Sequence, residues 1–309
     1  MRFPGLSLSL AISLMVTQLA CARSGALGEA TEAPAADPTA VYLPTVLAED
    51  NTPAGVSTEN ELLTSAGETR QYRLFVPGGY STGTAVPLVL NLHGLNSDPV
   101  QQEDISQFSV KAQAETFIVV YPAGTNGDWN FVTPGSPDEV FLSELIVALQ
   151  GAYAIDAQRI YVTGISNGAE MAYELVCHVD VFAAAGFVSG AYPRVFPCHD
   201  TPLPAVGFHG TDDNFLPYNG NALFLPVLDW AQSWADRNGC TTGPTTTYQQ
   251  GEVTGQTWTT CTAQADVVFY TVTGKGHSWP GSSMPPAITT QDIDATDALW
   301  AFFAAHQRP

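Results

Sequence analysis

The stretch Gly164-Ile165-Ser166-Asn167-Gly168 decides the fold of this 309-residue chain. It follows an apolar, β-prone run at 159–163 and precedes a helical pattern at 169–177. Two glycines allow a tight strand-to-helix turn, on which a strained serine stands above the sheet edge while the helix N-terminus stabilises negative charge beside it. The stretch therefore predicts a nucleophile, Ser166. The alternative is that Ser166 only caps the helix.

Candidate partners for Ser166 follow later in the chain. A serine hydroxyl becomes a good nucleophile when a base takes its proton and a carboxylate orients that base. Carboxylates, including Asp213, lie in the loop at 208–217, and His277 lies in the loop at 274–281. The order Ser166, Asp213, His277 is the α/β-hydrolase order. We predict that His277 is the base and that Asp213 orients it.

Negative charge that develops on a substrate oxygen also needs hydrogen-bond donors. We expect the first donor to be the backbone N–H of Asn167, directly after the serine. The second should come from the loop after an early strand, at 91–98. We choose the N–H of Leu95 there, with that of Gly94 as the second choice.

Apolar, β-prone runs alternate with longer helical patterns, which indicates an α/β sheet with parallel crossovers. The central runs are almost continuously apolar, as a sheet covered on both faces requires. We predict an α/β-hydrolase fold with a mostly parallel central sheet and helices on both faces. Strands are predicted at 71–76, 86–92, 117–121, 159–163, 182–188, 204–208 and 267–272, and helices at 138–153, 168–177, 224–237 and 291–305.

The N-terminal residues have the layout of an export signal. Residues 1–22 carry Arg2, an apolar run and small residues at the end, which predicts a signal peptide. Cleavage before Arg23 competes with a lipoprotein signal in which Cys21 is lipidated, although Gln18 stands where that signal normally has an aliphatic residue. Residues 23–55 are rich in Ala, Pro, Thr and Glu and predict a disordered tether, and 56–309 form one folded domain.

The charge balance limits the partners. Ten basic and 30 acidic residues give a formal net charge of −20, which excludes a nucleic-acid partner and disfavours anionic membranes. Membrane association is expected only through lipidated Cys21. We expect an exported or extracytoplasmic monomer without a cofactor.

Four cysteines fall within the predicted domain, and an even number in an exported protein indicates two disulfides. Pairing of sequence neighbours is the simplest choice, Cys177 with Cys198 and Cys240 with Cys261. A zinc site is not expected, because neither C-x-x-C nor H-E-x-x-H spacing occurs.

Several motifs together resemble the secreted esterase family of feruloyl esterases, acetylxylan esterases and polyhydroxybutyrate depolymerases. The resemblance covers nearly the whole domain and implies that Asp213 is the acid, with Asp212 as second choice. It also implies the Cys240–Cys261 disulfide. Ala169 and the bulky Leu95 depart from the family pattern, which makes Leu95 the less certain donor. The motifs are Leu92-His93-Gly94, residues 161–168, His209-Gly-Thr-Asp-Asp213 with Pro217, Asn238-Gly239-Cys240 and Gly276-His277-Ser-Trp279-Pro-Gly281.

Aromatic residues give an indication of the substrate. Trp129, Tyr218 and Trp279 are expected in loops near the triad, where they would bind a feruloyl ring or a flat sugar face; the alternative is that they pack in the core. The leading hypothesis is an exported serine ester hydrolase that acts on plant polysaccharide esters through an acyl-enzyme. The first alternative is a single-domain polyhydroxybutyrate depolymerase, and the second is a non-catalytic surface lipoprotein.

Overall fold

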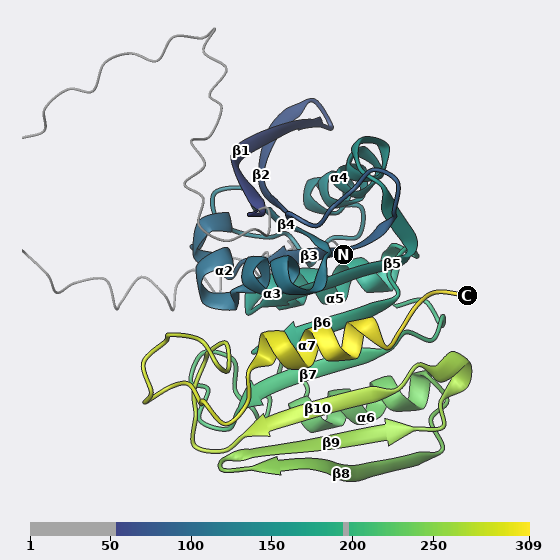
Figure 1. Ribbon diagram of the computed structural model, residues 1–309. Coiled ribbons are helices and arrows are strands. Elements are labelled where there is room, and N and C mark those ends of the chain that lie inside the picture. The colour runs from purple at the N-terminus through teal and green to yellow at the C-terminus, as the bar shows by residue number, and fades with distance from the viewer. Residues whose placement is uncertain (1–53, 194–197) are drawn as a thin grey trace, which may run out of the picture. The chain divides into compact units, whose positions relative to one another are not determined.

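The computed structural model describes residues 54–193 and 198–309 (Figure 1). The predicted signal peptide at 1–22, with Cys21, lies outside these ranges, as does nearly all of the predicted tether at 23–55. Within the described part of the chain, no helix is long and apolar enough to cross a bilayer.

A single sheet of ten strands organises the described residues, in the order β1-β2-β4-β3-β5-β6-β7-β10-β9-β8. The strands from β4 to β10 in this order are parallel, and antiparallel strands extend the sheet at both ends. The strands are β1 (Val56–Ser65), β2 (Glu68–Val76), β3 (Val86–Leu92), β4 (Ile118–Pro122), β5 (Ile155–Ile165), β6 (Ala184–Val188), β7 (Ala205–Gly210), β8 (Thr242–Gln250), β9 (Val253–Thr259) and β10 (Val267–Val272).

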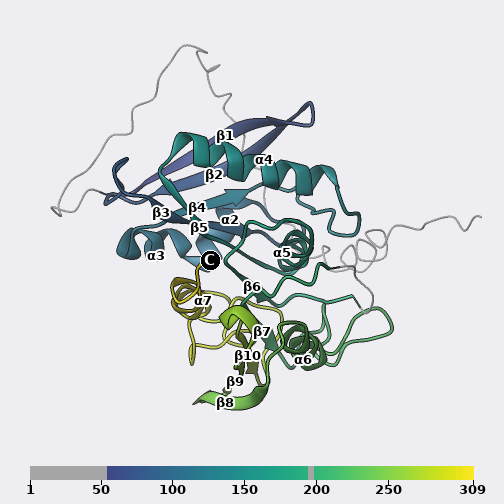
Figure 2. The same cartoon turned by 90° about the vertical axis from the view of Figure 1, so that its right-hand side faces the viewer.

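Helices cover both faces of this sheet (Figure 2). One face carries α2 (Pro99–Ser106), α3 (Phe108–Glu115) and α7 (Ala295–Ala304), and the other carries α4 (Pro137–Ala152), α5 (Asn167–His178) and α6 (Val227–Arg237). This arrangement confirms the predicted α/β class with a mostly parallel centre.

The fully buried strand β6 illustrates how the two layers pack. A Cβ at Gly186 would overlap Leu299 of α7, so the absence of a side chain lets this helix lie close to the sheet. The next residue, Phe187, points to the opposite face, where its ring lies 5.3 Å from that of Trp230 in α6. Successive side chains of β6 point to opposite faces of the sheet, and both faces are covered by helices. The sequence of β6 is therefore continuously apolar.

Strand register brings distant loops to one edge of the sheet. Leu92 pairs with Gly164 and Ile165 pairs with Val188, so β3, β5 and β6 end at the same level. Gly210 at the end of β7 pairs with Val272 at the end of β10. The carboxyl edge of parallel strands is where ligands bind in open α/β sheets.

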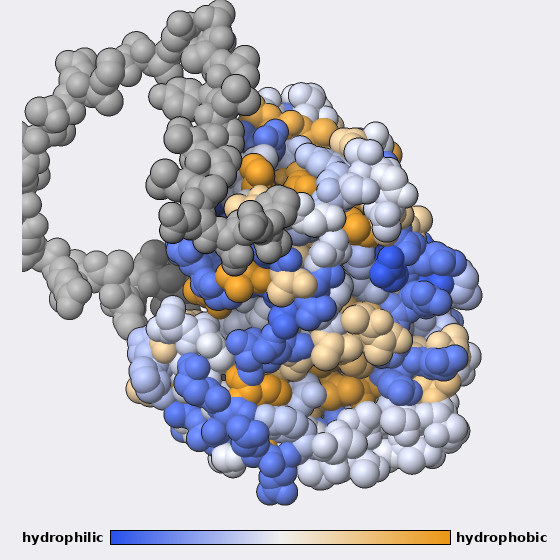
Figure 3. All heavy atoms as spheres, in the orientation of Figure 1, coloured by the Kyte–Doolittle hydropathy of each residue, from blue (hydrophilic) through white to orange (hydrophobic). Residues whose placement is uncertain are grey.

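Sequence patterns did not predict β1, β8, β9, α2 or α3. Strand β8 is mostly exposed and rich in threonine and glutamine, so it lacks apolar alternation. In the space-filling view, the surface over β8 and β9 is correspondingly pale, between hydrophilic and hydrophobic (Figure 3). Helix α2 is polar because its buried residues form hydrogen bonds: Gln102 donates to Asn91 of β3, which donates to Ser106.

Two disulfides are present, Cys177–Cys198 and Cys240–Cys261. The first links the last turn of α5 to the chain that leads into β7. The second links the end of α6 to the end of β9. Each pair closes a loop with a sequence separation of 21, which restricts the unfolded chain more than the folded one.

Candidate active site

Ser166 is the single residue between the end of β5 and the start of α5. Its backbone has φ 57° and ψ −126°, an unfavourable conformation for a residue with a side chain. The Ser166 N–H donates to the carbonyl of Val188 at 2.9 Å. Its own carbonyl accepts from the N–H groups of Ala169 and Glu170. The turn thus holds Ser166 in a strained backbone conformation.

Glycines on both sides of Ser166 are required sterically. A Cβ on Gly168 would overlap the carbonyl oxygens of Leu92 and His93. A Cβ on Gly164 would lie 2.6 Å from the Gly168 carbonyl carbon and 2.7 Å from the Leu92 oxygen. The first turn of α5 therefore packs directly on the backbone at the end of β3.

The two other predicted triad members lie in direct contact. His277 Nδ1 lies 2.7 Å from Asp213 Oδ2, and the Asp213 side chain is fully buried. The other carboxylate oxygen, Oδ1, accepts from the N–H groups of Phe215 and Leu216, each at 2.9 Å. Because the carboxylate can only accept, His277 carries its proton on Nδ1 and leaves Nε2 with a free lone pair.

A second histidine stabilises the same carboxylate. His209 Nε2 lies 2.8 Å from the Leu216 carbonyl and 3.3 Å from Asp213 Oδ2. Burial on its own would raise the pKa of Asp213, but hydrogen bonds from His209 and then His277 outweigh it. The pKa of this carboxyl is therefore held well below its ordinary value, and Asp213 stays ionised at neutral pH.

The loop of His277 is fastened to the sheet beside Ser166. The Ser189 Oγ donates to the carbonyl of Ser278 at 3.0 Å. Ser189 directly follows Val188, the residue that accepts the hydrogen bond from Ser166. The serine and the histidine loop are thus both anchored at the end of β6.

The loop after β3 borders Ser166 on another side. A Cβ on Gly94 would lie 3.5 Å from the Cβ of Ser166, so this backbone is in contact with the serine. His93 fixes the loop, because its Nδ1 contacts the Gly94 carbonyl at 2.8 Å and its Nε2 accepts from the Gly124 N–H at 2.9 Å. Burial lowers the pKa of His93, which favours the neutral ring that this pattern requires.

The two predicted oxyanion donors, Leu95 and Asn167, directly follow the two residues in contact, Gly94 and Ser166. Asn167 is the first residue of α5, so its N–H is one of the donors that no intrahelical partner satisfies. Its side chain exchanges two hydrogen bonds with the backbone of Trp129. Leu95 follows Gly94 directly and is partly exposed. Both donor roles remain predictions.

A buried acid lies near the start of α5 without adding charge there. Glu170 is 3% exposed. Burial, followed by the charge of Asp128, raises the pKa of Glu170 to about 8. At neutral pH the carboxyl is therefore mostly protonated, so the positive potential at the N-terminus of α5 is preserved.

The aromatic residues proposed for substrate binding lie differently from our expectation. Trp129 and Trp279 are each 1% exposed. The indole N–H of Trp129 donates to the His93 carbonyl, and that of Trp279 donates to Thr296 Oγ1. Neither ring offers a face to a ligand in this structure, because both are used to support the loops. Tyr218 is half-buried, and its hydroxyl contacts Thr271 Oγ1 at 2.7 Å.

Sequence reasoning missed an exposed aromatic residue, Phe215. Its side chain is 63% exposed, and its ring centroid lies 5.4 Å from that of His277. Phe215 lies between Asp213 and Pro217, in the loop that carries the predicted triad acid. This position could have indicated an aromatic residue near the active site.

Comparisons with known proteins show what this chain is similar to. Residues 70–198 match the family model described as Esterase PHB depolymerase. The bifunctional acetylxylan esterase/xylanase XynS20E of Neocallimastix patriciarum is 28% identical over 76% of this chain, which spans about a third (34%) of that protein. The probable feruloyl esterase C of Aspergillus clavatus is 29% identical, over 76% of this chain and 84% of that one.

Among solved structures, an acetyl xylan esterase from Aspergillus awamori matches with a TM-score of 0.59. The match covers 80% of this chain and 99% of that one, at 17% sequence identity. At this identity the likeness concerns the fold, and it confirms the predicted α/β-hydrolase architecture.

The close packing at Gly168 predicts a large effect of a small substitution. Gly168→Ala should lower the free energy of unfolding by about 1–3 kcal/mol, because backbone atoms of β3 have to move. The matched control is Gly151→Ala near the end of α4, where nothing lies within 4 Å of the added methyl. That change should be neutral or stabilising by up to about 1 kcal/mol. Denaturant unfolding measures both, and equal effects would contradict the packing argument.

The depressed pKa of Asp213 predicts a specific dependence of stability on pH. Its ionised form contributes stability that is present above the unfolded pKa of about 3.9 and is lost as the pH falls toward the folded pKa. The difference in unfolding free energy between the wild type and Asp213→Asn should therefore shrink between pH 5 and pH 3. Denaturant unfolding at both pH values measures it. A difference that grows on acidification would contradict the assignment.

Proposed function

We propose that this chain, whose residues 70–198 match the Esterase PHB depolymerase family model, is an esterase that cleaves carboxylic esters through an acyl-enzyme on Ser166. The observation that carries the proposal is the 2.7 Å contact between His277 and buried Asp213, taken together with a serine held at φ 57° on a strand-to-helix turn. In α/β-hydrolase enzymes the catalytic serine stands on such a turn and is activated by such a base.

The first half of the reaction forms the acyl-enzyme. His277 Nε2 takes the proton of Ser166 as its Oγ attacks the carbonyl carbon of the ester. The carbonyl oxygen becomes an oxyanion, which accepts hydrogen bonds from the N–H groups of Asn167 and Leu95. His277 then gives its proton to the leaving alkoxide, the ester C–O bond breaks, and the alcohol departs.

The second half releases the acid. His277 takes a proton from water, whose oxygen attacks the acyl carbon, and the same two N–H groups hold the oxyanion. The bond to Ser166 breaks, and its Oγ recovers a proton from His277. Throughout, ionised Asp213 holds the Nδ1 proton and stabilises the imidazolium, which its depressed pKa allows at neutral pH.

For the substrate, we propose esters attached to plant polysaccharides, either feruloyl or acetyl groups. The names of the relatives support this class, since they include an acetylxylan esterase and a feruloyl esterase. Exposed Phe215 beside His277 supplies an aromatic face that a phenolic ring or a sugar ring can stack on. The description of the family model favours a polyester, polyhydroxybutyrate, as the second candidate.

We further propose that the protein works outside the cytoplasm. The two disulfides support this location, because disulfides persist in oxidising compartments. The N-terminal signal predicted from sequence is consistent with export, and lipidation of Cys21 stays a proposal.

Substitutions in the proposed triad should separate the two neighbouring aspartates. Ser166→Ala should abolish covalent labelling by a fluorophosphonate probe and lower kcat at least about 10³-fold. Asp213→Asn should lower kcat about 10⁴-fold, because His277 would lose its charged partner. Asp212→Asn is the matched control, since Asp212 is exposed, and it should keep kcat within about twofold. A large loss only in Asp212→Asn would reassign the acid.

A substrate panel tests the proposed class. Methyl ferulate and acetylated xylan should be hydrolysed along with 4-nitrophenyl acetate, and hydrolysis of polyhydroxybutyrate alone would overturn the polysaccharide assignment. Phe215→Ala should raise KM for methyl ferulate by about three- to tenfold, as expected for a lost aromatic contact, with little change for 4-nitrophenyl acetate. Val110→Ala, another exposed apolar residue, is the control and should change neither value.

A further inference from the structure

The interface between helices α4 and α5 contains a group of side chains that the proposed reaction does not use. We infer that Glu139, Glu174 and His178 form a binding site for one divalent transition-metal ion, of which Zn²⁺ is the representative. The inference is independent of the proposed function. It rests on the convergence of three donor groups and on the burial of a carboxylate that no hydrogen bond satisfies.

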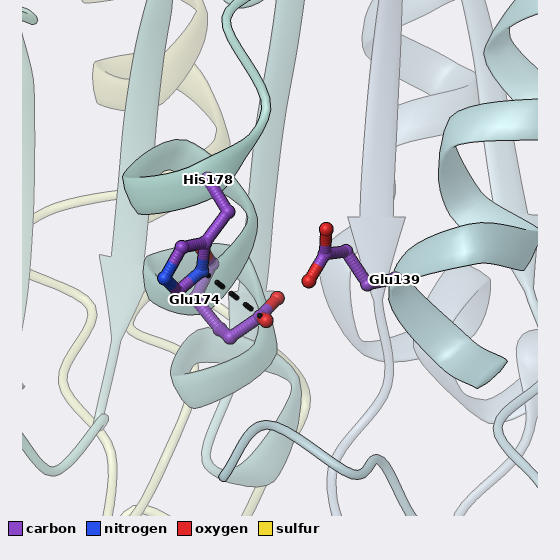
Figure 4. Close-up of side chains that lie close together, drawn as sticks. All are labelled: Glu139, Glu174 and His178. Carbon is purple, nitrogen blue, oxygen red and sulfur yellow. Dashed lines mark hydrogen bonds and ion pairs between the residues drawn. The ribbon is translucent and has the colours of Figure 1, made fainter. Parts of the chain in front are cut away.

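The three side chains point toward a common region from two helices (Figure 4). One donor atom of each lies within 4.8 Å of the others. Ligands of one Zn²⁺ ion at about 2.1 Å stand about 3–4 Å apart, so a small closing rotation suffices. Glu139 and His178 are half-buried. Glu139 accepts a hydrogen bond from the Gly135 N–H and His178 Nδ1 contacts the Glu174 carbonyl, so binding would exchange these contacts for the ion.

The sequence spacing explains why two donors share a face. Glu174 and His178 are four residues apart in α5, and such pairs lie one above the other on a helix. Glu139 comes from the first turn of α4. Metal sites in helix bundles combine glutamates from some helices with glutamate–histidine pairs at i, i+3 from others, and the pair here is one residue wider.

Glu174 gives the second and independent observation. Its side chain has no exposed surface, and in the ionised form neither carboxylate oxygen has a hydrogen-bond donor within residues 54–193 and 198–309. Oε1 lies 3.3 Å from His178 Nδ1. A buried carboxylate normally has partners or coordinates a metal, so this one indicates a ligand.

The donor set selects the kind of ion. Two carboxylates and one imidazole suit Zn²⁺, Mn²⁺ and related ions, and the two negative charges balance a divalent cation. The neighbouring acid Asp138 does not compete, because it is paired with Arg70 at 2.5 Å.

The alternative to a metal ion is a proton shared between Glu174 and Glu139. Burial, followed by a hydrogen bond that the protonated carboxyl shares with Glu139, raises the pKa of Glu174 to about 9. Without a cation, Glu174 therefore keeps its proton at neutral pH. The experiment has to distinguish an ion from this proton.

The position of the site indicates a structural effect. Glu174 lies eight residues after Ser166 along α5, which corresponds to about 12 Å. An ion there would tie α5 to α4 without touching the ester. We therefore expect binding to raise thermal stability and to leave ester turnover unchanged.

The experiment titrates the purified, chelator-treated full chain, without a histidine tag, with Zn²⁺ alone by calorimetry and with Co²⁺ alone by visible absorption. The wild type should bind one ion per chain, and Tm should rise with Zn²⁺ concentration. Glu174→Gln and Glu139→Gln should each weaken binding at least about tenfold. Glu174→Gln is nearly isosteric with the protonated acid, and Glu139→Gln changes the other helix in case the first variant fails to fold.

Glu144→Gln is the matched control, an exposed glutamate on the same α4 helix, and it should bind like the wild type. The absence of binding in the wild type would overturn the inference and leave the shared proton. Loss of binding in His178→Gln, with binding unchanged in Glu174→Gln and Glu139→Gln, would also overturn the inference. It would mean that the histidine binds the ion at the surface without the two glutamates.

Discussion

The close passage of the α5 backbone over the carbonyl oxygens of Leu92 and His93 is the constraint on which the site depends. A Cβ at Gly168 would overlap these carbonyl oxygens, so the start of α5, directly after Ser166, packs backbone to backbone on the end of β3. Since the loop after His93 starts at this contact, both expected oxyanion donors have their spacing set by main-chain packing. Such preorganisation spares the reaction the cost of reorienting donors.

Charge is distributed within the site according to what the reaction requires. The chain is strongly acidic, with a formal charge of −20, and an oxyanion would be destabilised by nearby negative groups. Asp213 is ionised, and hydrogen bonds from His209, His277 and two backbone N–H groups stabilise its charge. Glu170, nearest the helix start, stays largely protonated through burial. Of these two buried acids, only Asp213 is therefore mainly ionised at neutral pH, and its charge faces His277.

Sequence predicted the central strands and the triad candidates, because glycine spacing and apolar runs are local signals. It did not predict β8, whose exposed edge needs no apolar pattern, or α2, whose buried face is stabilised by Gln102 and Ser106. The burial of Trp129 and Trp279 depends on partners 36 and 17 residues away. The Glu139 cluster was missed because its third donor lies on another helix.

One contact described above also bears on how the protein forms. The Thr296 hydroxyl of α7 donates to the Ser106 carbonyl of α2, across a sequence separation of 190 residues. His277 and Asp213 meet across 64 residues, and the central strands pair in parallel through long crossovers. Chains dominated by such non-local contacts fold slowly. The contact between His277 and Asp213 cannot form before the chain has been synthesised beyond residue 277, so the proposed active site is completed late in synthesis.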